Sequence, residues 1–334
     1  MVAGYRVCRV ARPVLPGPRN RTATAVEFVC KLAAIVSENP HPLADELDSL
    51  TTLDLLGVIH REDRNALDAV QGGIPEIADA VNEILPRLRA GGGLHYFGAG
   101  NSGRIAALDA AECPATFGLD RWRVQAHESG DGSPEDDQSG GRLAARRANL
   151  GPNDVAVGVT AGGGTAYVAA ALEEARAAGA LIVVLVCAIG SPLVANADIA
   201  IEIPTGPEVI AGSTRMKAGT AQKVVLNMIS SAVFTKLGYT HRGRMVGVVA
   251  DNDKLRRRAA RIVSELTEAS VHRVERALAD SDGDARLAVL MVSRGVDVEE
   301  ARLALSSADG SLSVALHSGW SIDKTSNSED ETAT

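Results

Sequence analysis

The middle of the chain alternates short apolar runs with longer segments of helical hydrophobic spacing. A short, nearly continuous apolar run indicates a strand buried on both faces. The predicted strands are Leu94–Phe97, Arg123–His127, Val155–Val159, Leu181–Cys187 and Ile199–Ile203. Helical spacing between and after them predicts helices over Arg104–Ala111, Tyr167–Ala178 and Gly219–Lys236, with a polar loop at Ser129–Gly141. This alternation predicts an α/β fold with a doubly wound, mostly parallel sheet and helices on both faces.

Helical patterns flank this central part on both sides. Before it, apolar spacing predicts helices over Ala23–Val36, Asp45–His60 and Ile74–Arg89. After it, similar spacing predicts a bundle built from Leu255 to about Leu278, Val298–Leu305 and Ser311–His317. We therefore expect a variable, partly disordered arm (1–40), N-terminal helices (41–90), a ligand-binding α/β domain (91–250), a C-terminal helical bundle (251–318) and a disordered tail (319–334).

Composition limits the classes of partner. The net charge is −8 and no basic stripe is interleaved with aromatic residues, so we expect no nucleic-acid partner. No apolar run is long enough to span a membrane. The four cysteines lack metal or disulfide spacing and indicate reduced thiols in a cytoplasmic protein, and the scattered histidines predict no metal site. The Arg- and Pro-rich first 22 residues do not form a convincing signal peptide, so we expect a disordered arm or a start codon assigned too far upstream.

Two loops carry the features of a phosphate site. Gly98-Ala-Gly-Asn-Ser-Gly-Arg104 joins a predicted strand to a predicted helix. In Glu208–Lys223, Gly212, Ser213 and Thr214 offer hydroxyls and N–H groups where another helix begins. Such groups at a helix N-terminus bind anions, although an ordinary helix cap would explain a single loop. The first loop also fits G-x-G-x-x-G, so a nicotinamide enzyme with Glu128 on the ribose remains an alternative.

A third loop, Ala161-Gly-Gly-Gly-Thr165, follows another predicted strand. In a doubly wound sheet all three loops reach the carboxyl edge, where ligands bind. Only three cations accompany them, namely Arg104, Arg215 and Lys217, which suits one phosphate better than a polyphosphate.

A catalytic group is expected among the acidic residues near these loops. We expect Glu112 to end the first core helix before Pro114, where the negative end of the helix favours a protonated carboxyl group suited to acid–base catalysis. The alternative is a surface glutamate at a frayed helix end. Cys113 is expected to be a buried, inert thiol and not a nucleophile. The acidic run at 134–137 is a further candidate, or else a solvated loop.

With these motifs the chain resembles the N-acetylmuramic acid 6-phosphate etherases, a branch of the sugar isomerase (SIS) fold that also includes glucokinase-regulatory-type proteins. The resemblance runs from about residue 39 to about residue 316. It rests on the 98–104 loop, on Ala111-Glu-Cys-Pro-Ala-Thr116, on the 208–223 stretch and on Pro134-Glu-Asp-Asp137.

The resemblance implies a lyase that removes D-lactate from N-acetylmuramic acid 6-phosphate and leaves N-acetylglucosamine 6-phosphate. It implies a cytoplasmic homodimer in amino sugar catabolism and cell wall recycling that needs no metal or organic cofactor. The implied catalytic residues are Glu112 and Glu135. The implied substrate-binding residues are Gly100, Asn101, Ser102, Thr165, Glu208, Ser213, Thr214 and Lys217.

Three departures from the family pattern keep other functions open. Asn101 stands where the family has Thr, and the 161–165 loop lacks the family's serine and arginine. The segment between Phe117 and Pro134 is several residues shorter, which removes a Gly-Gly-Glu turn that helps to close the site. A non-catalytic sugar-phosphate sensor is therefore the principal alternative. An aldose–ketose isomerase on the same fold is a third possibility, without a specific motif.

Overall fold

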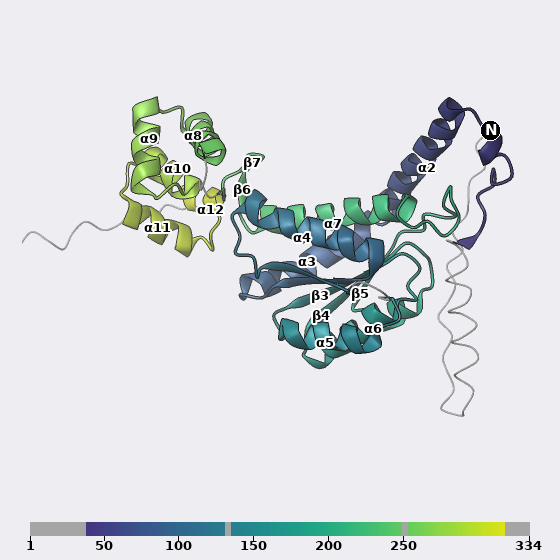
Figure 1. The fold of residues 1–334 in the computed structure, drawn as a ribbon. Helices are drawn as coiled ribbons and strands as arrows, with labels where there is room; N and C mark the ends of the chain where they lie inside the picture. The colour runs from purple at the N-terminus through teal and green to yellow at the C-terminus, as the bar shows by residue number, and fades with distance from the viewer. Residues whose placement is uncertain (1–37, 131–134, 249–252, 318–334) are drawn as a thin grey trace, which may run out of the picture.

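The computed structural model describes residues 38–130, 135–248 and 253–317 (Figure 1). The expected helix at 23–36, the N-terminal arm and the C-terminal tail lie outside these residues. In the described parts of the chain, no helix is both long and apolar enough to cross a membrane.

The centre of the fold is a five-stranded parallel sheet with the strand order β2-β1-β3-β4-β5. Its strands are β1 (Leu94–Gly98), β2 (Val124–Glu128), β3 (Val155–Thr160), β4 (Leu181–Val186) and β5 (Ile199–Glu202). The chain leaves β1 first for β2 on one side and then returns to β3 on the other. This reversal opens a crevice beyond the carboxyl ends of β1 and β3, the usual ligand position in such sheets.

Helices cover both faces of the sheet, which confirms the predicted doubly wound architecture (Figure 1). One face packs against α3 (Ile74–Arg89), α4 (Gly100–Phe117) and α7 (Lys217–Lys236), and the other against α5 (Gln138–Ala148) and α6 (Ala166–Ala177). In β4, Leu181, Val183 and Leu185 join the first core while the alternating Ile182 and Val184 join the second. The apolar runs are continuous because both sides of each central strand are covered.

The N-terminal helix is longer and begins later than expected. After a short 3₁₀ turn, η1 (Leu47–Ser49), helix α2 runs over Thr52–Gly72 instead of Asp45–His60. Thr51 caps it by accepting a hydrogen bond from the Asp54 N–H at 3.2 Å, and the helix contains no proline and runs to Gly72. The beginning of α2 projects beyond the sheet (Figure 1), where Leu53 is 80% and Leu56 58% exposed.

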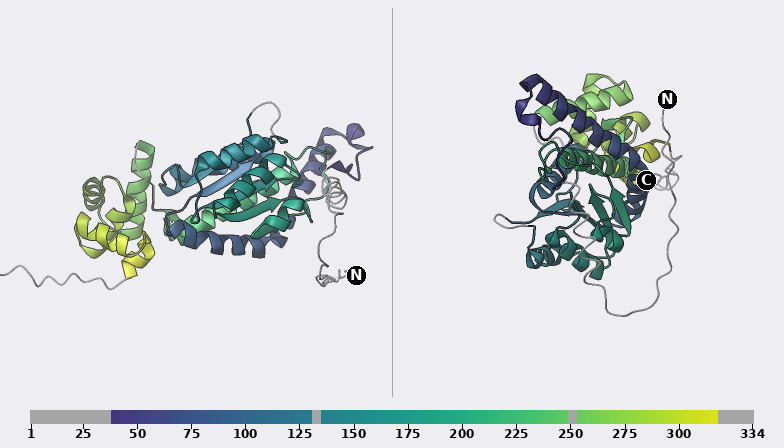
Figure 2. Two further views of the ribbon diagram at one scale, coloured as in Figure 1. Left: turned by 90° about the horizontal axis from the view of Figure 1, so that it is seen from below. Right: turned by 90° about the vertical axis from the view of Figure 1, so that its right-hand side faces the viewer.

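The C-terminal helices form a lobe at the end of the molecule opposite α2 (Figures 1 and 2). They are α8 (Asp253–Thr267), α9 (Val271–Asp280), α10 (Ala285–Arg294), α11 (Val298–Ser307) and α12 (Leu312–His317), preceded by the hairpin β6 (Thr240–His241) and β7 (Arg244–Met245). They share an apolar core separate from those of the sheet. The sequence pattern missed α10 and the hairpin, and it missed α5, whose first turns lie inside the expected polar loop. A second short 3₁₀ turn, η2 (Pro192–Asn196), links β4 to β5.

Acid is expected to destabilise the sheet through two stacked histidines. His95 Nδ1 lies 3.1 Å from His127 Nε2, and the His127 ring stacks on Phe97. Burial, aided by His95, lowers the pKa of His127 to about 4, and burial also lowers the pKa of His95. Because the unfolded chain binds these protons at about pH 6.5 and the folded chain does not, stability falls as pH drops from about 6.5 towards 4.

Urea unfolding measured at pH 7 and at pH 4.5 checks this prediction. A His127→Phe variant keeps a ring against Phe97 and should lose less stability between the two pH values than the wild-type protein. An equal loss in both proteins would show that other groups cause the acid sensitivity.

Candidate functional site

The first loop places an uncapped helix N-terminus at the crevice beside β1. Helix α4 begins at Gly100, whose φ of +54° favours glycine, and the Ala99 side chain provides no cap. Gly103 packs against β1 so closely that a Cβ there would lie 2.8 Å from the Gly98 carbonyl oxygen. The glycines of the motif therefore allow close strand–helix packing.

The first turn of α4 has the donors that an anion needs. No described residue accepts a hydrogen bond from the N–H groups of Gly100, Asn101 or Ser102. Ser102, which carries a hydroxyl, is buried with 9% of its surface exposed. Free N–H groups, a hydroxyl and the positive end of the helix together suit a phosphate.

The N-terminus of α7, in contrast, is already filled by a carboxylate of the same chain. Glu208 is 1% exposed and accepts hydrogen bonds from the N–H groups of Lys217 at 2.8 Å and Ala218 at 3.0 Å. Burial raises its pKa against the opposing effect of these two bonds. The N–H groups of Ser213 and Thr214 donate to carbonyl groups within the loop. The expectation of free amides was wrong for Ser213 and Thr214, so their two hydroxyls remain for a ligand together with the Gly212 N–H, which donates to no described residue.

Lys217 is also engaged within the protein. Its ammonium group lies 2.5 Å from a Glu62 carboxylate oxygen on α2 and 3.0 Å from the Pro207 carbonyl oxygen, and the residue is 4% exposed. Burial of Glu62 opposes its ionisation, but the bonds to Lys217 and neighbouring donors prevail and lower its pKa. Lys217 therefore anchors α2 to α7. Sequence reasoning missed Glu62, because the two residues are 155 positions apart.

The two predicted phosphate loops lie next to each other. A Cβ on Gly219, in the first turn of α7, would lie 3.0 Å from Asn101 Nδ2 and 3.4 Å from the Thr214 carbonyl oxygen. The structure therefore brings the 98–104 loop and the 211–217 loop together on the side of the sheet that α4 and α7 cover.

The third loop, after β3, is held by its own hydrogen bonds. Thr160 and Thr165 share one between their hydroxyls at 2.8 Å, and the Gly163 N–H donates to the Thr160 hydroxyl. Ser191 donates to the Gly163 carbonyl group at 3.2 Å. Since β3 pairs with β1, this loop borders the same crevice.

The two predicted catalytic glutamates occupy different places. A Glu135 carboxylate oxygen lies 3.2 Å from the Cβ position of Gly100, and the Tyr167 N–H donates to the Glu135 carbonyl group. Glu112 is exposed on α4, about 18 Å along the helix from Gly100. The helix does not end near Glu112 as expected, because it continues through Pro114 to Phe117.

Three further polar residues that the sequence did not indicate as catalytic lie on or beside α4: Glu128, Cys113 and Asp109. Glu128 ends β2 with its Cβ 3.5 Å from the Cβ position of Gly103, on the first turn of α4. Cys113 is buried, and burial followed by the nearby Asp109 raises its pKa to about 12, which agrees with an inert thiol. Asp109 is itself buried in a hydrogen-bonded network.

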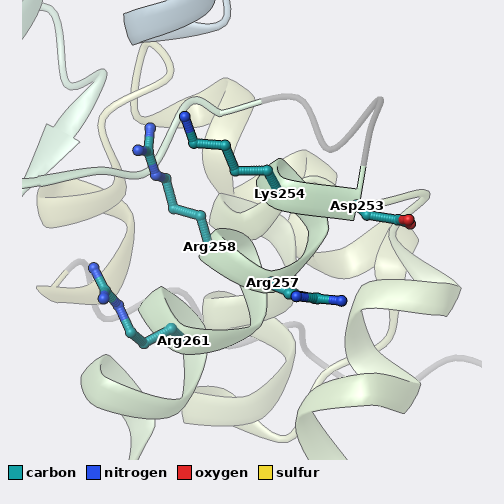
Figure 3. Close-up of a pocket in the computed structure, with 5 residues that line it drawn as sticks. All are labelled: Asp253, Lys254, Arg257, Arg258 and Arg261. Atoms are coloured by element: carbon teal, nitrogen blue, oxygen red, sulfur yellow. The ribbon is translucent and has the colours of Figure 1, made fainter.

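A separate hollow of about 560 Å³ lies along α8 in the C-terminal lobe. Lys254, Arg258 and Arg261 extend to one side of the helix, whereas Arg257 and Asp253 point to the other (Figure 3). None of the residues predicted for the sugar-phosphate site lines this hollow.

Comparisons with known proteins agree with the fold. An SIS domain model matches residues 138–232. The N-acetylmuramic acid 6-phosphate etherase of Thermobifida fusca is 49% identical over 73% of this chain and 83% of its own. The proteins of that name from Caldanaerobacter subterraneus and Streptomyces avermitilis are 42% and 44% identical, over 85% and 86% of this chain and 96% and 94% of their own.

Proposed function

The chain belongs to the N-acetylmuramic acid 6-phosphate etherase family, and we propose that it cleaves the D-lactyl ether of N-acetylmuramic acid 6-phosphate. The products are N-acetylglucosamine 6-phosphate and D-lactate. Besides the relatives, one feature carries the proposal: the Glu135 carboxylate lies beside the uncapped N-terminus of α4. This arrangement supports the assignment of Glu135 as an acid–base group beside the proposed phosphate site.

The catalytic groups of the protein need only to transfer protons in this reaction. The open-chain sugar has an aldehyde at C1, which acidifies the proton on C2. A carboxylate takes this proton, the C2–H electrons form a C2=C3 double bond, and the C3–O bond breaks. A carboxyl group protonates the departing lactyl oxygen, and water then adds to C3 while C2 regains a proton. Two glutamates that alternate between base and acid are sufficient.

The phosphate is assigned to the first turn of α4. There the N–H groups of Gly100, Asn101 and Ser102 and the Ser102 hydroxyl donate to it, and the hydroxyls of Ser213 and Thr214 reach it from the neighbouring loop. Thr165 and its loop border the sugar. Glu208 and Lys217 support the α7 end of the site through the bonds described above and make no direct contact in this proposal.

Removing the Ser102 hydroxyl should weaken binding of the 6-phosphate sugar more than removing the Ser213 hydroxyl. Ser102 is buried at the open helix end, whereas Ser213 is partly exposed in a loop where its own N–H and that of Thr214 are occupied. A hydrogen bond to a charged group contributes about 1.5–3 kcal/mol. Calorimetry with N-acetylglucosamine 6-phosphate measures both Ala variants, with the unphosphorylated sugar as control. An equal loss of affinity for both sugars would mean that the two serines do not contact the phosphate.

We further propose a homodimer in which Glu112 of one copy completes the site of the other. Glu112 is too far along α4 to reach the phosphate turn of its own chain. Leu108, one turn before it on an exposed face of α4, is 55% exposed, and α2 adds exposed leucines at 53, 56 and 67. Exposed apolar side chains of this kind mark an interaction surface. Light scattering should give about twice the chain mass of 34.7 kDa, and an active monomer would contradict the proposal.

A cytoplasmic location is part of the proposal, supported by the free, buried thiols of Cys113 and Cys187. The distance of Glu112 from its own loops also favours a second candidate, a sugar-phosphate sensor without catalysis. The two candidates differ in one assay, because a sensor binds N-acetylglucosamine 6-phosphate but releases no lactate from the ether substrate.

A further inference from the structure

A buried carboxylate lies in the middle of α4, away from the proposed phosphate turn. Asp109 is 6% exposed, and each of its oxygens accepts from uncharged donors. The bonds are Asn227 Nδ2 to Oδ1 at 2.7 Å, Ser230 Oγ to Oδ1 at 3.1 Å and Tyr96 OH to Oδ2 at 3.0 Å, with Cys113 Sγ 4.0 Å from Oδ2. A carboxylate is rarely this buried without a cation, so its retention calls for an explanation.

The donors come from the elements that carry the candidate site. Tyr96 is on β1, which leads into the 98–104 loop. Asn227 and Ser230 are on α7, which follows the 211–217 loop. Asp109 itself is on α4, two turns after Ser102. The Asp109 carboxylate therefore connects β1, α4 and α7, and the N-terminal turns of these two helices form the candidate site.

Helices α4 and α7 lie side by side and run in the same direction, with contacts at three levels. Asn101 meets Gly219 at the site end, Asp109 meets Asn227 and Ser230 in the middle, and the Phe117 and Phe234 rings lie 5.1 Å apart at the far end. Small apolar residues of both helices, among them Ala106, Ala110, Ala221 and Val225, belong to the same hydrophobic core. In the described residues, the polar side-chain contacts between these two helices centre on Asp109, which accepts from Asn227 and Ser230, with Cys113 also bonded to Ser230.

Two helices that pack through small apolar side chains can align in more than one register. A buried polar contact between them is satisfied in only one register. Fixing a register is the best-attested use of buried polar groups in helix pairs. A slip of α4 by one turn would shift its phosphate donors about 5.4 Å from the hydroxyls of Ser213 and Thr214. Even a displacement of about 1 Å can cost on the order of 10²-fold in rate.

We propose that Asp109 is a positioning residue that sets the register of α4 against α7 and so aligns the donors of Ser102 with those of Ser213 and Thr214. It does not touch the substrate. The inference rests on the proposed function for the identity of the ligand, but the register itself is a property of the free protein.

The test replaces the whole network by apolar side chains. The quadruple variant Tyr96→Phe, Asp109→Leu, Asn227→Leu and Ser230→Ala removes every N–H and O–H donor of the network and leaves unpaired only the weak S–H donor of Cys113, so its thermal stability should stay close to that of the wild type. Its affinity for N-acetylglucosamine 6-phosphate should nevertheless fall at least about 10-fold. The affinity of Asp109→Asn, which keeps the side-chain shape and one acceptor, should lie between those of the wild type and the quadruple variant. Leu290→Ala in the C-terminal core is the control, because it should lower stability but not affinity.

Hydrogen exchange at the second turn of α4, where the N–H groups are bonded within the helix, and at the first turn of α7 provides a measurement that needs no ligand. The apolar variant should lose protection there relative to the wild type. Wild-type affinity or wild-type protection in a folded apolar variant would overturn the role of Asp109. If the wild-type protein itself bound no N-acetylglucosamine 6-phosphate, the proposed function would fail, and hydrogen exchange would still decide the register.

Discussion

Replacing Glu112 with Gln is expected to reduce lactate release roughly 10²–10⁴-fold, the usual contribution of a general acid or base. The affinity for N-acetylglucosamine 6-phosphate should stay near the wild-type value. Glu112 is exposed, and its side chain forms no hydrogen bond or ion pair with another described residue, so the amide should not disturb the fold. The rate of lactate release and calorimetric binding measure the two effects separately. Wild-type turnover in this variant would remove Glu112 from the mechanism.

A mixing experiment tests whether Glu112 acts across the proposed dimer. Glu135→Gln should be as inactive as Glu112→Gln when each variant is assayed alone. A dimer with one chain of each kind has one site with both glutamates and one with neither. Co-expression should therefore restore about one quarter of wild-type activity in a statistical mixture. Two differently tagged copies of Glu112→Gln provide the control, and a mixed sample as inactive as this control would place both glutamates in the same chain.

Replacing Lys217 with Ala is expected to cost stability before it costs phosphate recognition. It leaves the carboxylate of Glu62, whose side chain is 18% exposed, without its cation, and breaking a buried pair costs about 3–5 kcal/mol. Urea unfolding should show this loss. The double variant Glu62→Gln with Lys217→Met removes both charges and should recover most of the stability. If Lys217→Ala unfolded like the wild type but lost affinity for the 6-phosphate sugar, Lys217 would contact the phosphate directly.

The sequence predicted the sheet well because buried parallel strands are short, apolar and bounded by polar turns. It placed the start of α3 at Ile74 and all five strands within about two residues. It failed where the pattern is weak. The amphipathic stretch at 45–60 hid the start of α2, which Thr51 sets, and Gly140 and Gly141 hid the start of α5. Local caps set both boundaries, because Thr51 accepts from the Asp54 N–H and Asp137 from the Gly140 N–H, and an apolar pattern does not show such caps.

The sequence predicted which loops form the candidate site. Glycines with a nearby hydroxyl indicate a tight turn at a helix N-terminus, and such turns meet at the carboxyl edge of a parallel sheet. The partners of buried charges were not predictable, since Glu62 and Lys217, like Asp109 and Ser230, meet only in the folded chain. For the same reason the sequence could not show that Glu208 already occupies the N-terminus of α7.

The central claim, a lyase that breaks the bond between C3 of the sugar and the lactyl oxygen, is tested most directly by incubating the protein with N-acetylmuramic acid 6-phosphate in ¹⁸O-labelled water. The account predicts equal amounts of D-lactate and N-acetylglucosamine 6-phosphate, with the label at C3 of the sugar and none on the lactate hydroxyl. Absence of lactate release, or label on the lactate hydroxyl, would contradict it.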